Sequence, residues 1–123
     1  MIFERFFYII ACMIGFEFLD QEVGLEYCAG DEEIYREVIE GYLEEDRRED
    51  LAKAFDAEDL PNYRVNAHAI KSTSLTIGAT ELSAKAKALE YAAADGDLAF
   101  VKENNGELVA MYTDILDKIK AAL

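Results

Sequence analysis

The sequence predicts an all-α protein, an antiparallel up-and-down four-helix bundle with one or more additional N-terminal helices. Three observations support this prediction. Apolar residues recur every three or four positions along four segments, which is the spacing of helices with one buried face. The connections between these segments span only a few residues, so successive helices must run antiparallel to bury both apolar faces. No segment alternates like a β-strand, and 123 residues, 52% of them hydrophobic, suit one domain with one core.

Two helices are expected in the first half of the chain, a short additional helix and the first helix of the bundle. Asp20 is a good N-cap residue for a short helix, and Gly30 suits the left-handed conformation that ends one. Asp31 then begins a long amphipathic helix whose apolar stripe runs to Phe55. The very polar sequence EEDRRED interrupts this stripe, and a kink is expected near residues 46–50.

Three further helices are expected in the second half. The first begins at Asp59, with Pro61 in its first turn, and ends at Gly78. The next ends at the turn formed by residues 95–96, a typical Asp-Gly pair. The last begins at Asp97 and keeps its apolar spacing to the C-terminus.

The N-terminal residues have a different character. Residues 20–123 are expected to form the bundle domain, and residues 1–19 an apolar helix that packs on the bundle or on a partner. Residues 6–16 read FFYIIACMIGF, far fewer than the roughly 20 apolar residues that span a bilayer, and no small-x-small cleavage site follows. Membrane tethering through residues 2–18 and self-association through this apolar segment stay open as alternatives.

Composition disfavours several classes of function. Twenty-six acidic and twelve basic residues give a net charge of −14, which repels nucleic acid and anionic membrane surfaces. Cys12 and Cys28 are isolated, and with His68, the one histidine, they fall short of a structural zinc site, so no metal is expected. Reduced thiols of this kind indicate the cytoplasm. The chain also lacks a glycine-rich phosphate loop, so it is not expected to bind ATP.

The most informative segment reads HAIKSTSLTIGA, residues 68–79. At about 100° per residue, the core stripe of this helix is centred between Ala67 and Ile70, so His68 points outward. Its surface neighbours are small or apolar, in a protein that is otherwise rich in carboxylates: Val65, Ala69, Ser72 and Leu75. An uncharged patch around one imidazole is typical of a docking site.

His68 and Lys71 together suit a phosphoryl carrier. Imidazole has an ordinary pKa of about 6.5 and is therefore a neutral nucleophile near physiological pH. Lys71 lies one turn along the helix, where its ammonium can approach a group carried by the ring and offset its negative charge. A surface histidine near a lysine is also common in proteins where neither has a function, so position alone leaves both interpretations open.

Several separated motifs resemble those of the histidine-containing phosphotransfer (HPt) family. The family pattern H-x-[L/I]-K-[G/S]-[S/T]-S is matched by HAIKSTS at residues 68–74, and the following x-x-[I/L]-G-A by LTIGA at residues 75–79. A later L-E element ahead of an A-x-x-G-D turn is matched by LEYAAADGD at residues 89–97. Together with residues 24–45 upstream, the similarity covers about residues 20–120.

The resemblance implies a helical bundle in a two-component phosphorelay. His68 would accept a phosphoryl group from the aspartyl phosphate of a response-regulator receiver domain and pass it to another receiver. Lys71 would steady the phosphoryl charge, and Glu90 would orient the imidazole, although Glu90 also fits an ordinary surface acid. The receiver would dock on the patch around His68. Many family members carry glycine where this chain has Ser72, which puts the choice of partner in doubt.

The resemblance also implies which partners and cofactors to expect. Receiver domains and a sensor or hybrid histidine kinase are the expected partners, and the magnesium ion would belong to the receiver, so the chain itself needs no cofactor. Such a module is a phosphotransferase-type carrier rather than a complete enzyme. Two alternatives stay open: a non-catalytic bundle that docks on receivers or kinases, and the excised phospho-accepting domain of a chemotaxis-type kinase.

Overall fold

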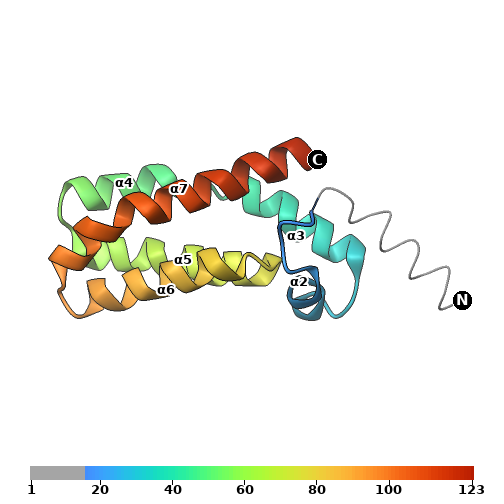
Figure 1. Ribbon diagram of the computed structural model, residues 1–123, viewed down its shortest axis with the longest axis horizontal. Coiled ribbons are helices and arrows are strands. Elements are labelled where there is room, and N and C mark those ends of the chain that lie inside the picture. The colour runs from blue at the N-terminus through green and yellow to red at the C-terminus, as the bar shows by residue number, and fades with distance from the viewer. Residues whose placement is uncertain (1–15) are drawn as a thin grey trace, which may run out of the picture.

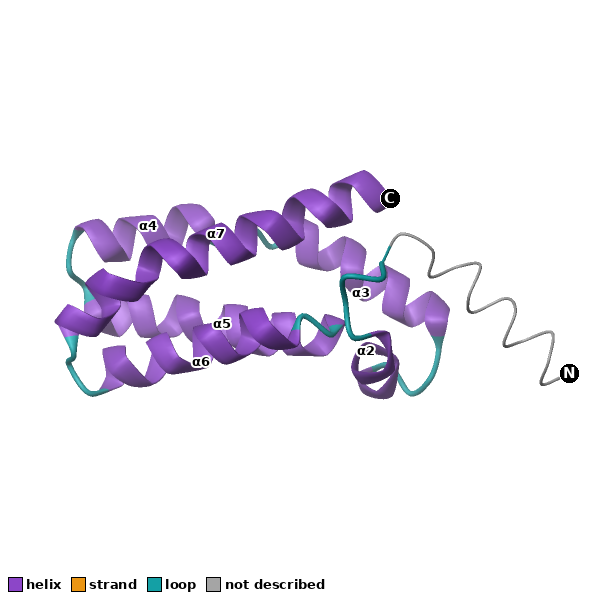
Figure 2. Cartoon of the chain, viewed as in Figure 1, coloured by secondary structure: helices purple, strands orange, loops and turns teal. Residues whose placement is uncertain are grey.

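A computed structural model describes residues 16–123, and its described residues form helices and no strand (Figures 1 and 2). This confirms the all-α prediction. The helices in chain order are α2 (Gln21–Tyr27), α3 (Glu32–Glu44), α4 (Arg48–Asp56), α5 (Leu60–Ile77), α6 (Thr80–Ala94) and α7 (Leu98–Ala122). The helix expected over residues 1–19 lies outside the described residues except at positions 16–19, and residues 17–19 form a turn.

The helices pack as a four-helix bundle in which α3 and α4 share one position (Figure 1). α5 is central, because it contacts α2, α3, α4 and α6, while α7 closes the bundle against α6 and α3. The α4–α5 and α6–α7 turns lie at one end of the bundle, and α2 lies at the other, beside the α5–α6 turn. Among the described helices, α5 and α6 make the most extensive contact with each other.

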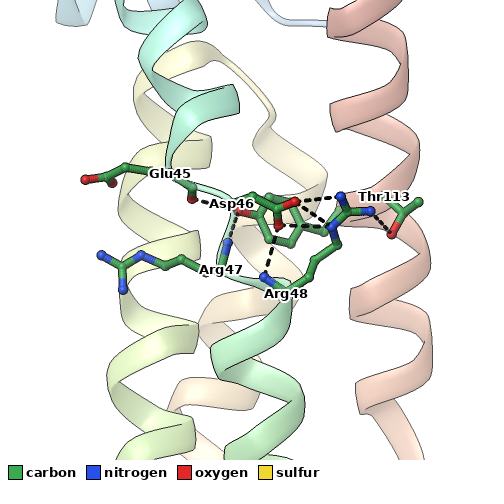
Figure 3. A network of polar contacts seen from close by, with 6 residues as sticks. Glu45, Asp46, Arg47, Arg48 and Thr113 are labelled. Atoms are coloured by element: carbon green, nitrogen blue, oxygen red, sulfur yellow. Dashed lines mark hydrogen bonds and ion pairs between the residues drawn. The ribbon is translucent and has the colours of Figure 1, made fainter.

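The break between α3 and α4 differs from the single kinked helix that the apolar stripe predicts. Asp46 accepts a hydrogen bond from the backbone N–H of Arg48 at 3.0 Å, which competes with helix continuation. The Tyr112 hydroxyl of α7 accepts from the N–H of Arg47 at 3.1 Å and donates to the carbonyl of Glu45 at 3.3 Å (Figure 3). A distant tyrosine therefore satisfies the backbone groups that the break exposes.

The helix starts confirm the sequence-based expectations. A first-turn backbone N–H donates to the side chain of each expected cap residue, namely Asp20, Asp31, Asp59 and Asp97. Each bond satisfies one of the N–H groups that the first turn of a helix leaves without a partner. These aspartates fix where each helix begins and therefore which of its faces meets the core.

α2 closes one end of the bundle through backbone contacts. The Asp20 N–H donates to the carbonyl of Gly78 at 2.8 Å, which joins the start of α2 to the α5–α6 turn. The buried Tyr35 hydroxyl donates to the carbonyl of Ile77 at 2.6 Å, and its ring packs directly against Gly24. Gly78 has φ +89°, the left-handed conformation that ends α5.

Candidate functional site

His68 lies on the outer face of α5, in the middle of the helix. Ala67 and Ile70, which flank it in the sequence, are fully buried in the core, whereas the His68 side chain is 58% exposed. The helical period therefore turns this ring away from the bundle interior. Because α5 is held on several sides, the backbone that carries the ring is fixed.

The structure brings His68, Glu90 and Lys71 into one cluster across α5 and α6. His68 Nδ1 lies 2.6 Å from Glu90 Oε1, and Lys71 Nζ lies 2.9 Å from Glu90 Oε2. The Glu90 side chain is only 9% exposed and the Lys71 side chain 23% exposed, so both lie under the more open imidazole. Glu90 is thus the shared partner of both residues.

The charge of Glu90 is set by opposing effects. Burial raises the pKa of this carboxyl, but the contacts from Lys71 and His68 outweigh burial, and the net pKa lies below its ordinary value. Glu90 is therefore ionised at neutral pH and can only accept hydrogen bonds. His68 Nδ1 must then carry the ring proton, which leaves the lone pair of the neutral imidazole on Nε2.

Lys71 does not stand free as the sequence spacing suggests. Its ammonium is paired with Glu90, so in the unmodified protein it balances the charge of that carboxylate. Ser83 of α6 donates from its hydroxyl to the Lys71 carbonyl at 2.8 Å, which fastens α6 to α5 beside this pair. Ser83 was not predicted from the sequence, because a serine inside a helix gives no distinctive local signal.

The residues expected to surround His68 differ in exposure. Val65 is 61% exposed and Ser72 is exposed as well, so both are available on the outer face of α5. Ala69 and Leu75 are half-buried and contribute less surface. A shallow depression beside the ring is lined by Pro61, Arg64, Val65, His68 and Glu90.

A comparison with models of protein families shows the family to which this chain belongs. The family model of the Hpt domain matches residues 38–121, which is more than half of the chain. The chain belongs to the Hpt domain family. The match includes the whole cluster of His68, Lys71 and Glu90, and it leaves out α2. No curated protein and no solved structure matches this Hpt domain in the corresponding comparisons.

Membership assigns a general role to this Hpt domain. Hpt domains carry out phosphotransfer in phosphorelay signalling, and they interact with receiver domains and kinases. Within residues 16–123, no helix is both long enough and apolar enough to cross a membrane.

Proposed function

We propose that this Hpt domain is a phosphoryl carrier between two receiver domains, with His68 as the phospho-acceptor. One observation carries the proposal: an outward imidazole is bonded through Nδ1 to a buried, ionised carboxylate, which leaves Nε2 as the nucleophile. A carboxylate that orients a histidine and stabilises its cationic form is a recurring arrangement in group-transfer sites.

The transfer follows from this geometry. The Nε2 lone pair attacks phosphorus in line with the receiver's aspartyl oxygen, the N–P bond forms, and the P–O bond breaks with its electron pair left on the aspartate. The phosphorylated ring keeps the proton on Nδ1 and becomes cationic, and the Glu90 carboxylate 2.6 Å away offsets that charge. Attack by the aspartate of a second receiver reverses these steps. The magnesium ion for this chemistry belongs to the receivers in our proposal.

We propose that receivers dock on the outer face of α5 around His68. The docking residues would be Val65, Ala69, Ser72 and Leu75, with most of the contact area from the two exposed ones. The side chain of Ser72 is small, so we expect that the backbone of a partner can still approach α5 closely.

We also propose that residues 20–123 act as the carrier unit in the cytoplasm, and that residues 1–19 pack on the bundle, on a partner or on a second copy of the chain. Phe16 and Leu19, which belong to the described end of this segment, are buried in the same core as the bundle, and their burial supports the proposal. Recovery of the full chain only with detergent would contradict the cytoplasmic assignment.

The proposal is tested by incubating the protein with a panel of phosphorylated receiver domains from the same genome. A carrier acquires an acid-labile, alkali-stable phosphate on His68 and passes it on when a second, unphosphorylated receiver is added. A docking module would bind receivers without acquiring phosphate, and a kinase fragment would be labelled only by an ATP-dependent kinase domain. Either of these two results would overturn the proposed relay.

Replacing Glu90 by alanine is expected to slow phosphorylation of His68 by about 10–100-fold, the range typical when the orienting partner of a metal-bound histidine is removed. The variant removes the acceptor at Nδ1, so the ring can rotate and its proton can move to Nε2. The rate is measured as phosphoryl transfer from one fixed receiver at constant pH.

The matched control for this prediction is Glu90→Gln. Its side-chain carbonyl can still accept from Nδ1, so we expect it to keep much more of the rate than alanine does. Equal rates for Glu90→Ala and the unmodified protein would show that Glu90 does not orient the ring.

A further inference from the structure

The His68 site holds one cation that has no partner among the described residues. Lys71 is paired with Glu90, and several other lysines and arginines are paired with carboxylates, among them Arg48 with Asp46. Arg64 is exposed and forms no ion pair or side-chain hydrogen bond within residues 16–123. Arg47, Lys87 and Lys120 also form no ion pair among these residues, but Arg64 is distinguished by its position beside His68.

Around the circumference of α5, Arg64 and Lys71 are displaced from His68 in the same direction. Arg64 precedes the histidine by four residues and Lys71 follows it by three, so the two cations are about 20° apart around α5. Their Cα atoms are separated by roughly 10 Å along the helix axis, with the Cα atom of His68 between them. Helical side chains lean toward the N-terminus, so the ring leans over the turn that carries Arg64.

Arg64 lies beside the imidazole ring, in the shallow depression that both residues line. Arg64 and His68 line the same depression, together with Glu90 of α6. The depression lies on the N-terminal side of the imidazole, whereas Lys71 occupies the C-terminal side and is held by Glu90. A group on Nε2 would therefore have Arg64 as the available cation.

The charge balance of the site after phosphorylation favours a contact between Arg64 and the phosphoryl group. The site already contains one carboxylate, Glu90, and Lys71 balances it. A phosphoryl group adds close to two further negative charges, and the cationic ring offsets only one of them, which leaves an excess of about one negative charge. A guanidinium is always charged and presents N–H donors in a planar fork that fits phosphoryl oxygens.

We propose that Arg64 binds the phosphoryl group carried on His68 Nε2, with guanidinium N–H groups donating to the phosphoryl oxygens. This inference rests on the proposed function, because it requires His68 to be the phosphorylated residue. Lys71 then serves mainly to hold Glu90 in place, and Arg64 is the direct phosphoryl contact.

The test uses phosphoramidate, from which an imidazole nitrogen displaces ammonia and forms the N–P bond without any receiver. The second pKa of the phosphoryl group is then measured by ³¹P NMR over a pH series, for the unmodified protein and for Arg64→Gln. The chain has one histidine, so one phosphohistidine resonance is expected. A bound guanidinium favours the dianion, and its removal should raise the phosphoryl pKa by about half a pH unit.

Lys120→Gln is the matched control, because it removes one positive charge from an exposed position on α7. We expect the phosphoryl pKa of this variant to stay near that of the unmodified protein, and Arg64→Lys to restore part of the effect. Equal titrations for Arg64→Gln and the unmodified protein would overturn the inference. That result is independent of receivers, whereas failure of the relay appears as the absence of transfer from any receiver.

Discussion

A His68→Gln variant is expected to accept no phosphoryl group from any receiver domain, while its fold is retained. Glutamine can occupy the exposed position and hydrogen-bond to Glu90, but its amide nitrogen is not a nucleophile. The His68 side chain is 58% exposed, so the free energy of unfolding should change by less than about 1 kcal/mol. The measurement is acid-labile, alkali-stable phosphate after incubation with a phosphorylated receiver, together with a thermal unfolding curve.

The single histidine makes this result unambiguous. Phosphohistidine and phospholysine share the same acid lability, but removal of the one histidine eliminates the first of them entirely. Lys120→Gln, on the far helix α7, should accept phosphate at the unmodified rate and serves as the control. Acid-labile phosphate that persists on His68→Gln would place the acceptor on another side chain and refute the assignment.

A Gly78→Ala variant is expected to lose roughly 2–5 kcal/mol of unfolding free energy, the sum of left-handed strain and a steric clash. Gly78 has φ +89°, and a Cβ at this position would collide with the carbonyl oxygen of Asp20. The clash would also break the hydrogen bond from the Asp20 N–H to the Gly78 carbonyl, which joins the start of α2 to the α5–α6 turn. Thermal unfolding should show a midpoint lower by about 10 °C or more.

Gly96→Ala separates the two contributions. Gly96 is also left-handed, with φ +74°, but a Cβ there would meet no atom within 4 Å. Its replacement should therefore cost only the conformational strain, on the order of 1 kcal/mol. If Gly78→Ala were no less stable than Gly96→Ala, the close packing of the Asp20 segment on the α5–α6 turn would not contribute to stability.

Local features of this chain were predictable because their causes are local. Each aspartate cap bonds to a backbone N–H two or three residues away, so the cap and the helix start are read from the same short segment. The outward position of His68 follows in the same way, since the 3.6-residue period fixes its angle to the buried Ala67 and Ile70. The all-helical bundle follows from these stripes and from the short connections.

Features that depend on distant residues were predicted less well. The apolar stripe of α3 and α4 suggests one kinked helix. However, the Tyr112 hydroxyl hydrogen-bonds to the carbonyl of Glu45 and to the N–H of Arg47, so the chain can break into two helices there. The spacing in the sequence places Lys71 near His68, but it does not reveal that the Lys71 ammonium pairs with Glu90 in the unmodified protein. Arg64 was overlooked, because nothing in its sequence context distinguishes it from other surface arginines.

The amino-acid sequence alone decides that the chain forms helices, where they begin, and that one imidazole faces outward, because backbone capping and side-chain periodicity act within a few residues. The packing of α6 on α5 decides that Glu90, 22 residues away, meets His68 Nδ1 at 2.6 Å and holds Lys71 at the same time. The relative rotation and shift of two helices depend on all the side chains between them. No single segment encodes that arrangement, so the chemistry of this ring emerges only in the folded bundle.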